Sequence, residues 1–237
     1  MVIPAFNEER LLGETLRRIH DALTVFARRD WDTELIVCDN NSTDRTAEVA
    51  RAAGARVVFE PVNQIARARN CGAAAATGDW LVFIDANSHP SAELLEEVAT
   101  QIESGRCLAG GATIRIDAPQ VTAKGLALLW NCASRTLGWV AGSFVFCETR
   151  AFRHLGGFSH EWFASEEIDL SRRLKRLARA EAKRLVILHR HPVLTSARKI
   201  QLYSTREHLW FLTKLVVTGG RALASRDACH TWYDGRR

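Results

Sequence analysis

Short apolar runs alternate with longer segments of helical periodicity through the first half of the chain. Residues 34–38 (ELIVC) and 80–84 (WLVFI) have the composition of buried strands. Ahead of both runs, residues 11–26 carry apolar side chains three and four positions apart. This spacing is typical of a helix that covers one face of a sheet. This alternation predicts an α/β fold built on a largely parallel sheet.

The composition allows a large core and excludes several classes of protein. Of the 237 residues, 47% are hydrophobic and 25% are charged, which argues against a disordered, collagenous or small disulfide-rich chain. The net charge of +5 comes without a dense basic tract, so no nucleic-acid partner is expected. The six cysteines are scattered without metal-ligand spacing, which favours reduced thiols in a cytoplasmic protein. Neither a signal peptide nor a membrane-spanning segment is predicted.

The chain is expected to form one compact unit with a helical extension at its end. No linker rich in Pro, Gly or Ser separates the two halves, so residues 1–198 are predicted as the main domain and residues 199–237 as the extension packed on it. The apolar stripe of residues 201–217 favours packing against the core. Peripheral contact with the inner face of a membrane and pairing with a second subunit are the alternatives for this stripe.

Polar residues follow several predicted strands at the point where each strand ends. Because ligands of open parallel sheets bind outside the carboxyl ends of the strands, these residues are expected to share one cleft. Taken singly, such side chains more often cap helices or start turns, as predicted for Ser42 and Thr43. Asp39 and Asp85 stand out because each follows a strongly apolar strand and precedes a helix. The residues at the three strand ends are Pro4 to Glu8, Asp39 to Ser42, and Asp85, Ala86, Asn87 and Ser88.

The sequence lacks the two commonest phosphate-binding loops. Neither G-x-G-x-x-G after the first strand nor G-x-x-x-x-G-K-[ST] occurs, which argues against a nicotinamide dehydrogenase and a P-loop enzyme. Bound phosphates would then need a divalent cation held by oxygen ligands. Asp85 and Asn87 offer two such ligands, which is adequate for a cation shared with substrate phosphates.

A series of motifs resembles those of family 2 glycosyltransferases in order and spacing across residues 1–179. The motifs are VIPAFNEE at 2–9, CDNNSTD at 38–44, ARNCGAAAATGD at 68–79, FIDAN at 83–87 and EEIDL at 166–170. The resemblance implies a GT-A fold, a Rossmann-like mixed sheet flanked by helices. In this fold a nucleotide-diphosphate sugar lies over the carboxyl edge of the sheet, and a divalent cation, Mn²⁺ or Mg²⁺, bridges its pyrophosphate.

The resemblance also assigns the residues around the nucleotide. Asp39 would contact the base or the ribose, and Arg67 and Arg69 lie in the segment that family members place beside the nucleotide. For the two arginines, the alternative is a solvated helix face. The other residues assigned to the donor pocket are Pro4, Ala5, Glu8, Asp85 and Ala86.

The predicted metal ligands depart from the family pattern at one position. Asp85 opens the D-x-D motif, but Asn87 replaces its second acid and holds a cation less strongly than a carboxylate. In the similar glucosyl-phosphoglycerate synthases, a histidine after the last core strand joins the metal. Here His189 follows the apolar run 184–188 in a comparable place, with His191 as second choice and an ordinary surface or core histidine as the alternative.

The family's catalytic carboxylate falls on a pair of glutamates. By alignment, Glu167 replaces the Asp that removes the proton from the acceptor hydroxyl, and glutamate is a competent base. The alternative is that Glu166, Glu167 and Asp169 only oppose the dipole of a helix. Trp162, in the preceding loop, is a candidate for stacking on an acceptor sugar or for plain packing.

Together these features predict a glycosyltransferase that moves a sugar from a nucleotide diphosphate, with UDP favoured, to a hydroxyl group. Inversion with Glu167 as base is expected, although the comparison through His189 points to a retaining relative. A degenerate nucleotide-sugar binding protein without turnover is the second hypothesis, because Asn87 and Glu167 both depart from the family pattern. A nucleotidyltransferase ranks last, because its glycine-rich loop is missing.

Overall fold

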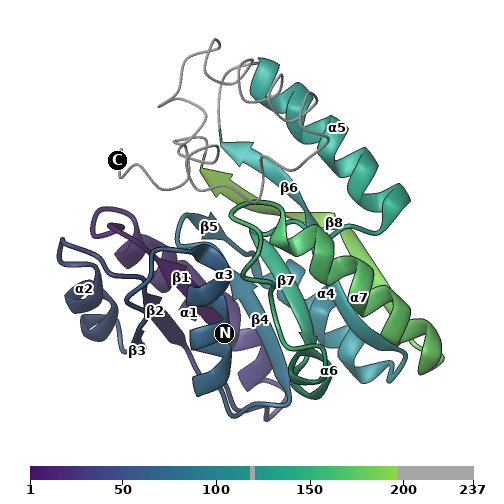
Figure 1. Cartoon of the computed structure of the whole chain (residues 1–237), viewed down its shortest axis with the longest axis horizontal. Coiled ribbons are helices and arrows are strands. Elements are labelled where there is room, and N and C mark those ends of the chain that lie inside the picture. Colours follow the sequence, from purple (N-terminus) through teal and green to yellow (C-terminus); the bar gives the residue numbers. More distant parts are fainter. Residues whose placement is uncertain (118–120, 197–237) are drawn as a thin grey trace.

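The computed structural model describes residues 1–117 and 121–196, which form one mixed sheet with helices on both faces (Figure 1). The sheet has eight strands in the order β3-β2-β1-β4-β7-β6-β8-β5. The strands are β1 (Val2–Ala5), β2 (Ile36–Asp39), β3 (Arg56–Phe59), β4 (Trp80–Ile84), β5 (Ser88–His89), β6 (Cys107–Asp117), β7 (Phe144–Glu148) and β8 (Arg184–Ser196). The helices are α1 (Leu12–Ala27), α2 (Thr46–Ala52), α3 (Ile65–Ala75), α4 (Ala92–Glu103), α5 (Val121–Leu137), α6 (Thr149–His154) and α7 (Glu166–Ala180).

The first four long strands form the parallel block predicted from the sequence. β1 lies between β2 and β4, with Ala5 paired to Asp39 and Val2 paired to Phe83. The carboxyl ends of these strands therefore meet at one edge of the sheet. This arrangement confirms the α/β prediction and places the polar strand ends on a common edge.

The other half of the sheet is mixed, as the resemblance implied, and differs from the predicted strands in two places. β7 runs antiparallel to both β4 and β6, and β8 runs parallel to β6. The predicted strand 184–188 continues to Ser196 through a bulge, because Leu188 pairs with Ala112 whereas Val193 pairs with Ile114. The short strand β5, which the sequence did not predict, pairs with the end of β8.

Two apolar layers bury the faces of the sheet. One layer packs under α1 and α4 and includes Leu16 and Leu95, and the other packs under α3, α6 and α7 and includes Phe83 and Leu174. No helix within the described part of the chain is long and apolar enough to cross a membrane. The predicted extension, residues 199–237, lies outside the described residues.

Gly110 of β6 is the point where the sheet leaves no room for a side chain. A Cβ atom there would lie 2.5 Å from the Phe146 ring and 2.6 Å from the backbone oxygen of Val186. We expect Gly110→Ala to lower the free energy of unfolding by about 1–3 kcal/mol, because the sheet must shift to admit a methyl group. Denaturant unfolding measures this change. The matched control is Gly125→Ala in α5, where a Cβ meets no atom within 4 Å and should stabilise the helix by about 0.5–1 kcal/mol. Equal stability of the two variants would contradict this account.

Candidate active site

Asp39 and Ala5 form one side of the candidate site at the ends of β2 and β1. Asp39 is buried, and its carboxylate accepts a hydrogen bond of 3.0 Å from the backbone N–H of Ser42. Pro4 and Ala5 are buried beside it in the neighbouring strand. Glu8 is also buried, and its backbone N–H donates to Thr46 Oγ1 at 2.7 Å. These four predicted donor-side residues therefore lie on two adjoining strands and the loop that follows β1.

The predicted caps of α2 are wrong in detail. Ser42 and Thr43 bond to Asn7 instead: Ser42 Oγ accepts from the Asn7 N–H at 3.0 Å, and the Thr43 N–H donates to Asn7 Oδ1 at 2.8 Å. Asp44 accepts from the N–H of Thr46, the first residue of α2, at 2.9 Å. Ser42 and Thr43 therefore join the loop after β1 to the loop after β2, and Asp44 satisfies the start of the helix.

Asp85 stands at the end of β4 and faces the interior of the site. Its side chain is 30% exposed, and Oδ1 accepts a hydrogen bond of 3.0 Å from Arg69 Nη2. The next residue, Ala86, is buried, and its carbonyl accepts from Thr15 Oγ1 at 2.7 Å. The carbonyl of Asn87 accepts from the N–H of Ser196 at 3.1 Å, while its side chain is partly exposed. The segment after β4 is therefore fixed by its backbone, and Asp85 and Asn87 keep side-chain oxygens for other partners.

Arg69 is the buried centre of the site and not a solvated residue. Its side chain is 2% exposed and lies over the ring of Phe158, 5.1 Å from the centroid. Nη1 donates to Glu166 Oε1 at 2.5 Å, and Nη2 donates to Asp85 and, at 2.8 Å, to the carbonyl of Gly142. Arg69 thus joins the end of β4 to the start of α7. The sequence left this role open, because Glu166 lies far away along the chain.

The glutamate pair opens α7 after Ser165, whose φ of 65° turns the chain sharply into the helix. Glu166 is buried, and burial raises its pKa although Arg69 opposes the shift. Burial together with the charge of Glu166 raises the pKa of Glu167 to about 8. Glu167 forms no ion pair within the described residues. A carboxyl group with such a pKa is suited to accept a proton near neutral pH.

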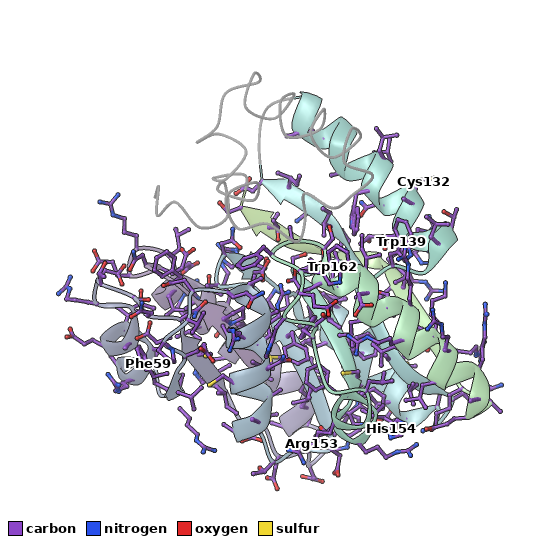
Figure 2. The ribbon with its side chains drawn as sticks, viewed as in Figure 1. Phe59, Cys132, Trp139, Arg153, His154 and Trp162 are labelled. Atoms are coloured by element: carbon purple, nitrogen blue, oxygen red, sulfur yellow. The ribbon has the colours of Figure 1, made fainter. Side chains whose placement is uncertain are left out.

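Asn70 of α3 and Gln64, the residue just before α3, hold the loop that leads to the glutamate pair. Asn70 donates to the carbonyl of Phe158 at 2.8 Å and accepts from its N–H at 2.9 Å. Gln64 Nε2 donates to the carbonyls of His160 and Trp162 at 2.8 and 3.1 Å. Trp162 (Figure 2) therefore belongs to a loop that Gln64 anchors just before α7. Sequence reasoning missed both anchors, whose signal was polar amides in a segment otherwise rich in alanine.

Two predicted residues are not joined to Arg69 or to the acids that it links. Arg67 is partly exposed, and its Nε donates to Gln64 Oε1 at 3.2 Å. His189 lies in the bulged part of β8 and is exposed, and no contact in the described part of the chain joins it to Asp85 or Asn87. The neighbouring His191 bonds to Glu97 of α4 at 2.5 Å. The roles of Arg67 and His189 stay predictions from the sequence.

The oxygen donors near the end of β4 fit a cation that is shared with a ligand. Within residues 1–117 and 121–196, no group of three or more His, Cys, Asp or Glu side chains could hold a metal ion alone. Asp85 and Asn87 supply one carboxylate and one amide oxygen, which suit Mg²⁺ or Mn²⁺ when phosphate oxygens complete the shell. The donor set therefore agrees with a cation that binds together with a diphosphate.

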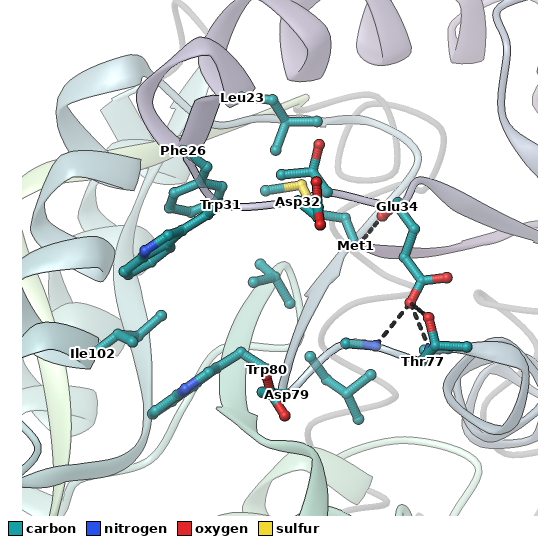
Figure 3. A pocket seen from close by; sticks show the side chains of 15 residues that line it. Met1, Leu23, Phe26, Trp31, Asp32, Glu34, Thr77, Asp79, Trp80 and Ile102 are labelled. Atoms are coloured by element: carbon teal, nitrogen blue, oxygen red, sulfur yellow. Dashed lines mark hydrogen bonds between the residues drawn. The ribbon is translucent and has the colours of Figure 1, made fainter. Parts of the chain in front are cut away.

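A separate cavity of about 570 Å³ lies at the opposite edge of the sheet (Figure 3). Its walls include Trp31, Trp80, Ile102 and the start of β1 at Met1. Glu34 closes one side by accepting from the Thr77 side chain at 3.0 Å. None of the predicted donor, metal or catalytic residues lines this cavity, so the candidate site remains the one at the carboxyl ends of the strands.

The mixed sheet, with acidic side chains at the carboxyl ends of its parallel strands, has the architecture predicted for a GT-A fold. The model of Glycosyl transferase family 2 matches residues 1–142. The chain therefore belongs to glycosyltransferase family 2, as its motifs predicted.

The curated relatives match the chain in part. An uncharacterized glycosyltransferase of Mycobacterium tuberculosis is 34% identical over 111 residues, which are 47% of this chain and 46% of that protein. The 4,4'-diaponeurosporenoate glycosyltransferase of Staphylococcus haemolyticus is 32% identical over 113 residues, which are 43% of this chain and 28% of that protein. The chain spans less than half the length of these curated relatives.

Solved structures confirm the predicted fold. TarS of S. aureus (residues 1–349) has a TM-score of 0.63 at 18% identity and covers 90% of this chain and 64% of its own. Mannosyltransferase PcManGT from Pyrobaculum calidifontis, in complex with GDP-Man and Mn²⁺, has a TM-score of 0.64 at 18% identity. The match covers 97% of this chain and 63% of the mannosyltransferase chain. Glucosyl-3-phosphoglycerate synthase of M. tuberculosis, with Mn²⁺, UDP and phosphoglyceric acid, has a TM-score of 0.61 at 20% identity. The match covers 96% of this chain and 77% of the synthase chain.

Proposed function

We propose that the protein transfers a sugar from a nucleotide diphosphate, UDP in the first instance, to a hydroxyl group of an acceptor. The observation that carries the proposal is the meeting of Asp39, Asp85 and the Glu166–Glu167 pair at one edge of the sheet. Acids from three separate elements gather there, and Arg69 links two of them. The complexes of TarS with UDP and UDP-GlcNAc support UDP as the first donor to test.

The donor is proposed to lie over the ends of β1 and β2. Asp39 would bind the base or ribose, and Pro4, Ala5 and Glu8 would form the wall of the nucleoside pocket. Arg67, on the exposed side of α3, and Ala86, behind Asp85, complete the proposed donor contacts. The bonds from Asn7 to Ser42 and Thr43 hold the two loops of this pocket together before the nucleotide binds.

Asp85 and Asn87 are the proposed ligands of the divalent cation, with His189 as a third candidate from the sequence. When bound, the cation would neutralise negative charge on the diphosphate that leaves the sugar. Asp85 keeps its orientation through the bond from Arg69, so its second carboxylate oxygen is available to the cation. Such preorganised charge at the leaving group commonly supplies a large part of the rate enhancement.

Glu167 is the proposed general base of an inverting reaction. Its carboxylate would accept the proton of the acceptor hydroxyl as the oxygen attacks the anomeric carbon and the bond from that carbon to the diphosphate breaks. The raised pKa of about 8 makes the carboxylate a stronger base than an ordinary glutamate. The loop that carries Trp162 would form the acceptor side, because Gln64 holds it next to the glutamate pair.

Thermal unfolding with nucleotides tests the donor and the cation together. We expect UDP with Mn²⁺ to raise the melting temperature by several degrees, because a ligand at about 100 times its Kd adds roughly 2.7 kcal/mol. The effect should vanish with chelator. GDP, TDP and ADP under the same conditions are the comparison, and smaller shifts are expected for them.

The same measurement separates the rival function. Asn87 in place of a second acid favours a binding protein without turnover, whose nucleotide binding would be insensitive to chelator. A shift by UDP that persists with chelator would therefore favour that rival. No shift with any of the four nucleotides would contradict the donor assignment itself.

A further inference from the structure

Arg69 occupies a position that ties together parts of the chain which meet only in the folded protein. It comes from α3, and its guanidinium group bonds to Asp85 after β4, to Gly142 before β7 and to Glu166 at the start of α7. The side chain is almost fully buried. It therefore cannot serve as a solvated contact for the nucleotide, which was one reading of the sequence.

We propose that Arg69 is a positioning residue for sugar transfer, which fixes Asp85 on the donor side and the glutamate pair on the acceptor side at a set separation. The proposal rests on the proposed function, because it assigns Asp85 to the cation and Glu167 to the acceptor proton. Arg69 acts through these two residues and does not touch the substrate.

The arrangement around Arg69 is shaped for this group and not for a generic core side chain. Burial of a charge is costly, and an apolar residue of similar volume often stabilises a core equally well. Here the planar fork of the guanidinium spans two carboxylates, which an ammonium group would not do in the same geometry. Position 142 also has to stay small, because a Cβ atom on Gly142 would lie 2.9 Å from Arg69 Nη2.

The link explains how the two halves of the reaction keep their alignment. Glu166 is the direct neighbour of Glu167 in the first turn of α7, so its bond to Arg69 sets the position of the base. The other terminal nitrogen of Arg69, Nη2, bonds to Asp85 and so sets the position of that carboxylate. A misplacement of about 1 Å between reacting groups can cost ~10²-fold in rate, so the separation held by Arg69 matters for turnover.

The first test compares Arg69→Lys with Arg29→Lys. Arg29, in the turn after α1, also bonds to two carboxylates, but both belong to α4: Glu96 at 2.6 Å and Glu103 at 3.0 Å. With Mn²⁺ and UDP-glucose as probe, release of UDP to water gives kcat and KM. We expect Arg69→Lys to lower kcat by about tenfold to 10²-fold with KM little changed. Arg29→Lys should retain the wild-type kcat. A wild-type kcat in Arg69→Lys would overturn the proposal.

The pH profile gives a readout that a purely structural role would not move. The positive charge of Arg69 opposes the raised pKa of Glu167. Arg69 also lowers the pKa of Glu166, whose negative charge raises the pKa of Glu167. Arg69→Met should therefore move the midpoint of the rise in kcat/KM, whereas Arg69→Lys, which keeps the charge, should move it less. A midpoint at the same pH in wild type and Arg69→Met contradicts the proposal, provided both proteins unfold cooperatively.

A second test needs no donor and so separates this proposal from the proposed function. Asp85→Asn and Glu166→Gln are made singly and together, with and without Arg69→Met, and the free energy of unfolding is measured. When Arg69 is present, we expect the change in the free energy of unfolding of the double variant to differ from the sum of the two single changes, because both acids bond to the same guanidinium group. In the Arg69→Met background the two changes should add. Additivity in both backgrounds would overturn the proposal even if UDP-glucose is turned over. Non-additivity only with Arg69 would support it even if UDP-glucose is not a substrate.

Discussion

Glu167→Gln is expected to reduce kcat for sugar transfer by about 10²–10⁴-fold while KM for the donor changes little. The amide keeps the size of the side chain but cannot take the acceptor proton. In the wild type, kcat/KM should rise with pH and level off above about 8, because the carboxyl of Glu167 must be ionised to act as a base. The variant should lose this rise. UDP release measured across the pH range checks both statements.

Although Glu167→Gln is expected to lose activity, its stability is expected to increase. The pKa of Glu167 is near 4.5 in the unfolded chain, as for an ordinary glutamate, but about 8 in the folded protein. The contribution of Glu167 to stability is therefore fully present below the unfolded pKa and is lost as the pH rises from there to about 8. Glutamine has no such dependence, so Glu167→Gln should gain melting temperature relative to wild type across this window.

The matched control for this variant is Glu161→Gln, which removes an exposed carboxylate from the loop that precedes α7. It should change neither the rate nor the pH dependence of stability. If Glu167→Gln kept the wild-type rate, the assignment of Glu167 as base would be wrong. If it melted well below wild type at pH 8, the loss of activity would reflect a damaged fold.

The regular elements were predictable because each carries its signal within a few neighbouring residues. The apolar run WLVFI predicted β4 at 80–84, and the helical spacing of apolar residues over 11–26 predicted the helix observed as α1 at Leu12–Ala27. The two-residue strand β5 has no such signal, because it exists only through pairing with Thr195 and Leu194 of a distant strand. The bulge in β8 likewise depends on its register with β6.

The candidate site likewise contains residues that local sequence predicted and residues whose role depends on distant partners. Asp39 and Asp85 were predicted because their place after apolar strands is visible in the sequence. The role of Arg69 was not, because whether an arginine in a helix faces solvent or a buried carboxylate is decided by packing. Its partner Glu166 is 97 positions away and arrives on another helix. Local spacing therefore identified the edge of the sheet that carries the candidate site, but not the ionic link beneath it.

The second large effect is expected at Asp85, whose carboxylate bonds to Arg69 and is also the proposed ligand of the cation. Asp85→Asn keeps the shape of the side chain and removes its charge, so the proposed cation would be left with two neutral amide ligands. We expect the Mn²⁺-dependent thermal shift by UDP to disappear and turnover to fall by about 10²–10³-fold. The variant should also lose about 1–3 kcal/mol of stability, because buried Arg69 loses a charged acceptor.

Asp79→Asn is the control for this variant, since Asp79 is exposed and lies just before the opposite end of the same strand, β4. It should leave nucleotide binding and stability unchanged. The two expected losses in Asp85→Asn have different causes and can be separated, because the stability loss needs no ligand whereas the binding loss needs Mn²⁺. An Asp85→Asn protein that is destabilised but still binds UDP with Mn²⁺ like wild type would show that Asp85 serves Arg69 alone, and the cation would then have to be held elsewhere.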